Sequence, residues 1–146
     1  MIELSFPVTV YYNIMSLSEM ISAGDYERVH PDINTDHFLI KEGDCCKTRI
    51  VLFHFNRVIS SDDVIKEIEK AEYRPANLAE LLALGMAQPK LLKHLPIVAL
   101  GQHWFSPGGI RYAVALGRDG VRHILYLQWL THRCHSRWRF AAVCKS

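Results

Sequence analysis

The sequence predicts an α+β fold in which two helices pack on mixed or antiparallel strands. Residues 60–88 have helical periodicity on both sides of Pro75, and the chain from Ile97 onwards consists of strand-like runs separated by glycine-containing turns. A strand, two helices and then several strands is an order typical of α+β domains. The chain has 146 residues, of which 49% are hydrophobic, so we expect a single domain over residues 1–146 with a real core.

Residues 1–50 are the part of the chain whose sequence is hardest to interpret. The segment "FPVTVYYNI" alternates like a strand, whereas "SAGDYERVHPDINTDH" is rich in turn residues, so we expect a short strand followed by irregular structure. From Arg49 onwards, "RIVLFHFNRVIS" combines β-branched and aromatic residues with polar ones at alternate positions. This pattern predicts a strand with one buried face.

The clearest local signals are those of two helices, predicted over residues 60–73 and 76–88. Ser60 or Ser61 provides an N-cap for the first helix, and Asp62 and Asp63 lie in its first turn, where the helix dipole favours negative charge. Pro75 interrupts the chain, and the apolar residues of "ANLAELLALGMAQP" then resume a helical period.

Strands fill the predicted C-terminal part. They correspond to "IVALGQHWF", "IRYAVAL", "VRHILYLQWL" and "WRFAAVC", with "SPGG" and "GRDG" as turns on either side of the second run. In the third run, period-2 alternation predicts that Leu125, Leu127 and Trp129 face the core. The opposite side would then expose Tyr126 together with Gln128 and Leu130, as a binding surface does.

Charge is distributed unevenly along the chain. Residues 94–146 hold seven basic side chains and one acidic side chain, a net charge of +6, whereas residues 1–93 have a net charge of −4. The basic part could bind phosphate groups, dock on the acidic part or be solvated. The four cysteines are too few and too irregularly spaced for a disulfide scaffold, so we expect free thiols.

No membrane insertion is expected, because no apolar run approaches the length of a membrane span and the N-terminus lacks the pattern of a signal peptide. We therefore expect a soluble protein that is cytoplasmic, or associated with a virion or cell surface through a partner.

Three chemical interpretations compete for the segment from His123 to Phe140. His132, Cys134 and His135 offer metal ligands, but their spacing is not that of a zinc site, and no third group completes a Cys–His catalytic pair. Single-stranded nucleic acid is favoured by arginines combined with aromatic rings that could stack on bases, but the arginines alternate with aliphatic residues and do not form a basic stripe. The arginines of this hypothesis are Arg118, Arg122, Arg133 and Arg137, and its rings are Tyr112, Tyr126, Trp129 and Trp138.

The range of amino acids in residues 110–138 is unusual. From the composition of residues 1–93, a 29-residue segment should contain about five or six Lys, Glu and Met residues, yet this one contains none. An asparagine codon whose two adenines are randomised cannot encode Lys, Glu, Met, Gln or Trp. Residues 110–138 keep to the amino acids that such a codon can encode at every position except Gln128, Trp129 and Trp138.

Several motifs in residues 51–146 resemble, in order and spacing, the variable proteins of diversity-generating retroelements. They are "ISSDDVIKEIEKAEYRPANLAELLALGMAQP", "LPIVALGQHW", "GGIRY", "GRDG", "LYLQW" and "RWRFAAV". The resemblance implies a C-type-lectin fold with a variable region, here residues 102–143, that an error-prone reverse transcriptase rewrites at adenine positions. It also implies a ligand-binding display function without catalysis or a cofactor, and a protein or cell-surface ligand as the partner.

The resemblance divides the variable region into frame and displayed positions. The frame positions are Arg111, Asp119, Gly120, Leu125, Leu127, Trp129, Arg139, Phe140 and Val143. The displayed positions, which we predict to contact the ligand, are Ile110, Tyr112, Arg118, Val121, His123, Ile124, Tyr126, Gln128, Leu130, Thr131, His132, Arg133, Cys134, His135, Ser136 and Arg137.

This sequence departs from the family pattern in two places. It ends in "RFAAVC" where the family usually has "RFLAVR", which leaves the last strand intact, and Gln128 lies outside the set of residues that a randomised asparagine codon encodes. The fold class also includes sulfatase-modifying enzymes with paired catalytic cysteines. Cys134 falls among the displayed positions, so we do not transfer that activity to this chain.

Overall fold

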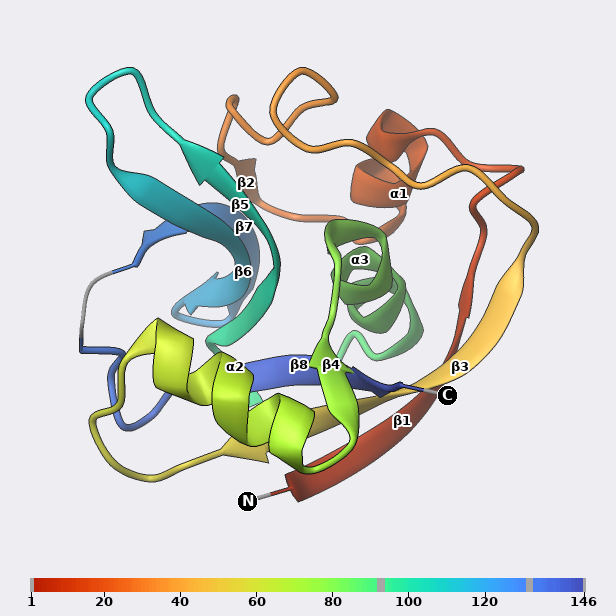
Figure 1. Cartoon of the computed structure of the whole chain (residues 1–146). Helices are drawn as coiled ribbons and strands as arrows, with labels where there is room; N and C mark the ends of the chain where they lie inside the picture. The colour runs from red at the N-terminus through yellow and green to blue at the C-terminus, as the bar shows by residue number, and fades with distance from the viewer. Residues whose placement is uncertain (1, 92–93, 131–132, 146) are drawn as a thin grey trace.

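The computed structural model describes residues 2–91, 94–130 and 133–145 and has a mixed α+β architecture. Three helices pack on an eight-stranded, mostly antiparallel sheet in this part of the chain (Figure 1). The elements are β1 (Ile2–Val10), α1 (Leu17–Ala23), β2 (Arg28–Val29), β3 (Cys46–His54), α2 (Ser61–Lys70), β4 (Tyr73–Pro75), α3 (Leu78–Ala87), β5 (Ile97–Phe105), β6 (Arg111–Asp119), β7 (Arg122–Trp129) and β8 (Arg139–Cys144). The α+β prediction is confirmed at this level.

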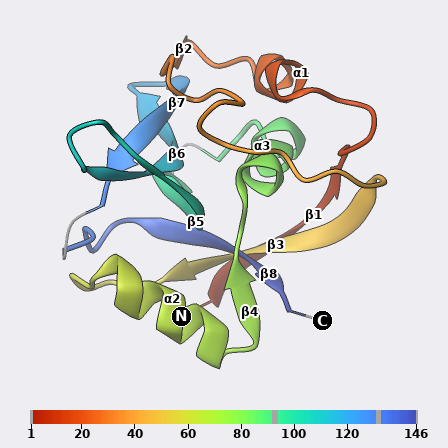
Figure 2. The same ribbon diagram turned by 45° about the horizontal axis from the view of Figure 1, so that its top comes forward.

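The strands follow the order β1-β3-β8-β5-β6-β7-β2, and β4 pairs with the far end of β8. Only the β5–β8 and β2–β7 pairs are parallel in the described sheet. The sheet curls around α3, which lies between β1–β3 on one side and β5–β7 on the other, and α2 lies outside this curl (Figures 1 and 2).

Both faces of the sheet are covered, so alternate residues of the central strands enter two different cores. Ile97 and Ala99 belong to the first core, with α1 and α3, whereas Val98 and Leu100 belong to the second core, with α2. Strands buried on both faces lose the alternation of apolar and polar residues, which explains the continuous apolar run at the start of β5.

The two helices predicted over residues 60–73 and 76–88 are present with shorter bounds, 61–70 and 78–87. The Ser60 hydroxyl accepts a hydrogen bond from the Asp63 backbone N–H and caps α2, and Asn77 forms a capping box with Glu80 at the start of α3. Helix α1 was not predicted, because its seven residues lie in the segment that we expected to be irregular. It also has a capping box, formed by Ser16 and Glu19.

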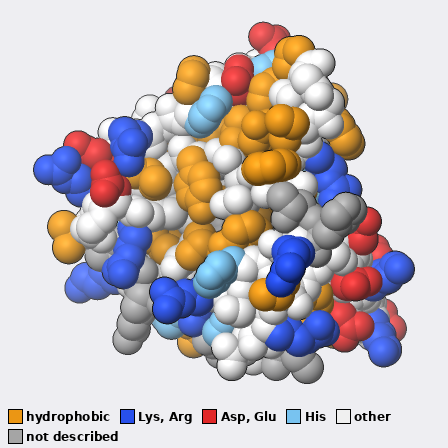
Figure 3. Space-filling model, turned by 90° about the vertical axis from the view of Figure 1, so that its left-hand side faces the viewer, with side chains coloured by type: hydrophobic (Ala, Val, Ile, Leu, Met, Phe, Trp, Pro, Cys, Tyr) orange, Lys and Arg blue, Asp and Glu red, His pale blue; other side chains and the backbone are white. Residues whose placement is uncertain are grey.

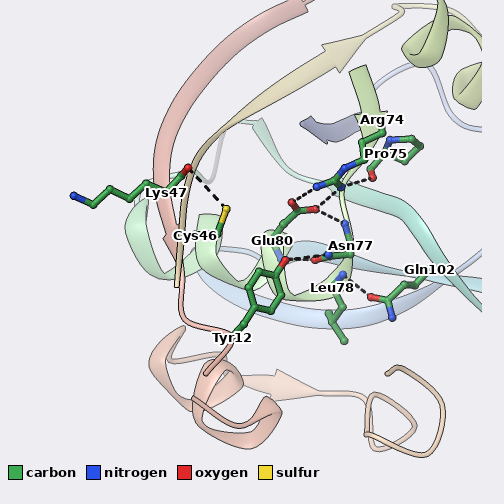
Figure 4. A network of polar contacts seen from close by, with 9 residues as sticks. All are labelled: Tyr12, Cys46, Lys47, Arg74, Pro75, Asn77, Leu78, Glu80 and Gln102. Carbon is green, nitrogen blue, oxygen red and sulfur yellow. Dashed lines mark hydrogen bonds and ion pairs between the residues drawn. The ribbon is translucent and has the colours of Figure 1, made fainter. Parts of the chain in front are cut away.

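A buried polar network holds α3 against β4, β5 and the N-terminal segment (Figure 4). The Arg74 guanidinium donates two hydrogen bonds to the Glu80 carboxylate, at 2.8 and 2.7 Å, and only 3% of Glu80 is exposed. Asn77 donates to the Tyr12 hydroxyl, and the Gln102 side chain accepts from the first backbone N–H of α3. The charge on Glu80 is therefore buried with its partners in place.

The N-terminal segment docks on the basic C-terminal part and closes the edge of the sheet at β7. The Glu27 backbone N–H donates to the His123 carbonyl, and Arg122 lies 3.2 Å from the Glu27 carboxylate. Arg28 lies 3.0 Å from Asp119, the one acidic residue of the C-terminal part. These ion pairs are exposed and contribute little stability, so backbone pairing is the main link. None of the described helices has the length and hydrophobicity to cross a membrane.

Candidate ligand-binding surface

The structure places the predicted displayed positions in very different environments. The exposed ones are Ile110, Arg118, Val121, Arg133, His135 and Arg137. The partly buried ones are Tyr112, His123, Ile124, Tyr126, Gln128 and Ser136. The buried ones are Leu130 and Cys134, while Thr131 and His132 lie outside the described residues.

These positions do not form a single patch, because β6 and β7 are an extended antiparallel pair. Tyr112 is in register with Trp129 at one end of the pair, and Arg118 is in register with His123 at the other end. Six residues of strand separate the two levels, which corresponds to about 20 Å. The turn after β6, with Val121 at its tip, is therefore separate from the surface at the other end of the ribbon.

That other surface, which we call the loop face, consists of residues 54–62, 105–111, 129–130 and 133–137. Backbone pairing brings its segments together: Ile59 and Cys134 form an antiparallel bridge, and the Leu130 N–H donates to the Arg111 carbonyl at 2.9 Å. The ring of His54 is hydrogen-bonded to the Ser136 carbonyl at 3.0 Å. Figure 3 views this side of the molecule, where hydrophobic side chains extend from the top to the middle of the view, with Lys and Arg side chains to both sides and below, and Asp and Glu side chains near the edges.

A groove of about 530 Å³ crosses the loop face between the start of α2 and the hairpin of β5 and β6. Its walls are apolar: Phe105 is 62% exposed, Trp129 is 56% exposed and Ile110 is 39% exposed. Large apolar side chains that are exposed together around a concavity mark binding sites on soluble proteins. Sequence reasoning missed Phe105 and the groove, although the aromatic run "HWF" directly before the "SPGG" turn is a signal that could have indicated them.

Arg111 forms the polar end of the groove and joins β6 to α2. Its guanidinium donates to the Ser61 hydroxyl at 2.6 Å and lies 3.6 Å from a carboxylate oxygen of Asp62. The Asp62 side chain is 72% exposed, whereas the Ser61 side chain is buried beneath it. Because Arg111 is held on both sides, it is a rigid part of the groove wall.

The prediction that Trp129 faces the core is wrong. Leu125 is buried and Leu127 partly buried on the same side of β7, but Trp129 belongs to neither core. The first core does not extend as far as the end of β7. There, Tyr112 lies opposite Trp129 on β6, but its ring stacks on Trp104 and not on Trp129. Period-2 alternation gives the direction of a side chain and does not say whether anything lies above it.

The prediction that Leu130 and Cys134 are displayed is also wrong. Beyond β7 the chain crosses the second core, where Leu130 is 6% exposed and Cys134 is fully buried. Burial raises the pKa of the Cys134 thiol to about 11, despite the opposing effect of Arg111. Both residues support the loop face from below.

The three rings of the nucleic-acid hypothesis that accompany Trp129 are all partly covered. Tyr126 packs over Gly117, where an added Cβ would lie 2.4 Å from the tyrosine ring, and burial raises the pKa of its hydroxyl. The prediction that Tyr126 is exposed is therefore wrong, because its ring is partly buried. Tyr112 stacks on Trp104, and Trp138 packs against the second core. Stacking of successive bases needs exposed ring faces, so these positions do not form a stacking platform.

The two paired segments of the loop face are rich in arginine. Residues 54–59 and 133–137 together contain Arg57, Arg133 and Arg137 and no acidic residue. Arg57, Arg133 and Arg137 are exposed. Acidic groups lie on the α2 side of the groove, where Asp62 and Asp63 are in the first turn of the helix. The electrostatic potential is therefore more negative on the α2 side than on the arginine side.

The residues of the metal hypothesis diverge in the structure. Cys134 points into the core while its neighbour His135 is exposed, so the two side chains do not share a site, and His132 is outside the described residues. Among the described residues, no three His, Cys, Asp or Glu side chains form a group suited to a metal ion. Comparisons with protein-family models, curated proteins and solved structures give no match for this chain.

Proposed function

We propose that this chain is a ligand-binding display protein with a C-type-lectin-like fold, whose variable region, residues 102–143, is rewritten by a diversity-generating retroelement. The loop face is its binding surface, the ligand is a protein or another cell-surface molecule, and the chain has no catalytic role. One observation carries the proposal: the loop face, on a doubly covered sheet, combines exposed and chemically varied side chains at Ile110, Arg133, His135 and Arg137 with a groove lined by exposed apolar residues.

The burial pattern refines which positions are suited to diversification. Substitutions at exposed positions usually change the free energy of unfolding by about 0.5 kcal/mol or less, whereas substitutions at buried positions cost more. Leu130 and Cys134 therefore serve as supports, and a rewritten codon at either position has to return an apolar or small residue. The hairpin tip at Arg118 and Val121 is a second exposed group, too far from the groove to contact the same small epitope.

The groove favours a protein ligand over single-stranded nucleic acid. Aromatic and arginine side chains around an apolar centre are the usual composition of strong protein-binding surfaces. Among the described residues of this face, Trp129 and Phe105 are the exposed Phe, Tyr and Trp rings that bases could stack on, and Asp62 and Asp63 would repel phosphates beside them.

The most direct test of the retroelement is the DNA around the gene. We expect a reverse-transcriptase gene and a near-identical copy of the segment that encodes residues 102–143, with differences concentrated at adenines of the copy. If neither is present in the complete genome, diversification by a retroelement is excluded for this chain.

The binding class is tested by varying the surface. Randomising Ile110, Arg133, His135 and Arg137 in a displayed library should leave most clones folded and should yield binders to unrelated purified proteins. A control library at Leu130 and Cys134 should fold poorly. A gel-shift titration with random single-stranded DNA at about 50 and 200 mM salt tests the alternative function, nucleic-acid binding. Tight DNA binding that weakens steeply with salt, together with a library that yields no protein binders, would favour nucleic acid as the ligand.

A further inference from the structure

We propose that the groove beside Trp129 is a constant anchor site that takes one aromatic or branched aliphatic side chain from an acidic loop of a protein partner. The inference rests on the proposed display function and specifies the chemistry of its ligand. It assigns affinity to side chains that are not rewritten, and specificity to the varied residues around them.

The apolar character of the groove defines the anchoring group. Phe105, Ile110 and Trp129 provide walls that are exposed by 62, 39 and 56%, and Leu130 is buried beneath them. A partner side chain that fills the groove removes this apolar surface from water on both sides of the interface. Well-packed pockets of this kind, centred on Trp and Arg, hold most of the binding energy in protein interfaces.

Charge complementarity defines the surroundings of the anchoring group. The loop-face segments 54–59 and 133–137 contain three arginines and no acidic residue, and the Ile59–Cys134 bridge joins them next to Ser60 and Leu130 in the groove lining. On the opposite side, Arg111 lies between Ser61 and Asp62 and offsets part of the negative charge of the first turn of α2. A loop with Asp or Glu next to the anchor fits this field, and a basic loop does not.

The groove is also the part of the loop face that codon rewriting leaves unchanged. Trp129 lies outside the set that a randomised asparagine codon encodes, Arg111 is a frame position, and Phe105, although inside the variable region 102–143, is not among the displayed positions. Ile110 and Leu130 belong both to the groove lining and to the displayed positions, and of these two only Ile110 is exposed. With a constant anchor, every variant would have a basal affinity for partners that carry the anchoring side chain. The varied residues around the anchor would then determine which of these partners binds.

Cyclic random peptides on phage, panned on the full chain in about 0.15 M salt, test the anchor. We expect enriched peptides with a central Trp, Phe, Tyr or Leu next to Asp or Glu. For a synthetic copy of the best peptide, Trp129→Ser and Phe105→Ser should each raise Kd by about tenfold or more. The matched control is Leu39→Ser, an 80% exposed leucine outside the loop face, which should leave Kd within about twofold.

The outcomes separate this proposal from the display function. Failure to enrich peptides, enrichment of basic peptides, or unchanged Kd values for both serine variants would overturn the anchor. In the last case, a loss of binding on Arg137→Ser would leave the loop face as a protein-binding surface without the anchor. Thermal melts of each variant identify a loss of fold, and if Trp129→Ser is unstable, Phe105→Ser decides the test.

Discussion

Replacing Trp129 and Leu130 in turn by alanine tests the division between exposed and supporting residues on the loop face. Leu130 lies in the second core and is only 6% exposed. Leu130→Ala should therefore lower the free energy of unfolding by about 3 kcal/mol, through lost apolar burial and a new cavity. Trp129 is 56% exposed and is a member of neither core, so Trp129→Ala should cost about 1 kcal/mol. For a chain of this length, these values correspond to falls in Tm of about 6–12 °C and 2–4 °C.

The assay is thermal and urea unfolding of both variants beside the wild type, with circular dichroism as the probe. Strand alternation alone predicts the reverse order, with a large cost at Trp129 and almost none at Leu130. Trp129→Ala costing more than Leu130→Ala would therefore refute the assignment of these residues. Iodide quenching adds an independent check, because Trp129 should be the most accessible of the three tryptophans and its removal should take away most of the quenching.

Three further predictions concern the fold beneath the loop face. Glu80→Gln should destabilise the chain by about 2–4 kcal/mol in urea titrations, because it leaves Arg74 without its buried carboxylate. Glu42→Gln on the surface is the control and should be nearly silent. In the native state, Ellman's reagent should label the exposed thiols rapidly and Cys134 slowly, because burial raises its pKa to about 11; equal labelling rates would contradict its burial. Burial also lowers the pKa of His103, whose Nε2 has no hydrogen-bond partner among the described atoms. The unfolded chain therefore binds this proton more readily, so stability should fall as pH drops below about 6.5, and His103→Phe should flatten that dependence.

The helices and most strands could be predicted because their signals are local. Ser60 and Asn77 cap α2 and α3 through hydrogen bonds that span only three residues, and Pro75 separates the two elements in the sequence. The strand-like runs after Pro96 correspond to β5–β8, with bounds that differ by at most three residues. Helix α1 was missed because a seven-residue helix is too short to establish a period among turn residues.

The resemblance to retroelement variable proteins predicts residues 102–143 as the variable region, and the structure separates the exposed positions of that region from the buried ones. Exposure at Ile110, Arg133, His135 and Arg137 agrees with the displayed positions that the resemblance implies. Phe105 and Trp129, which that pattern did not mark as ligand-binding, line the groove instead. The fold family, the retroelement and the ligand stay predictions that the experiments above can test.

The sequence by itself determined the α+β class, the two capped helices and the order of the C-terminal strands, because caps, turns and periodicity act over a few neighbouring residues. Only the tertiary structure decided which residues are exposed. Trp129 and Leu125 have the same orientation on β7, but a core covers only Leu125, and Cys134 is buried because the chain returns to pair with Ile59. Burial depends on segments distant in sequence, such as residues 54–62, that no local pattern around these side chains contains.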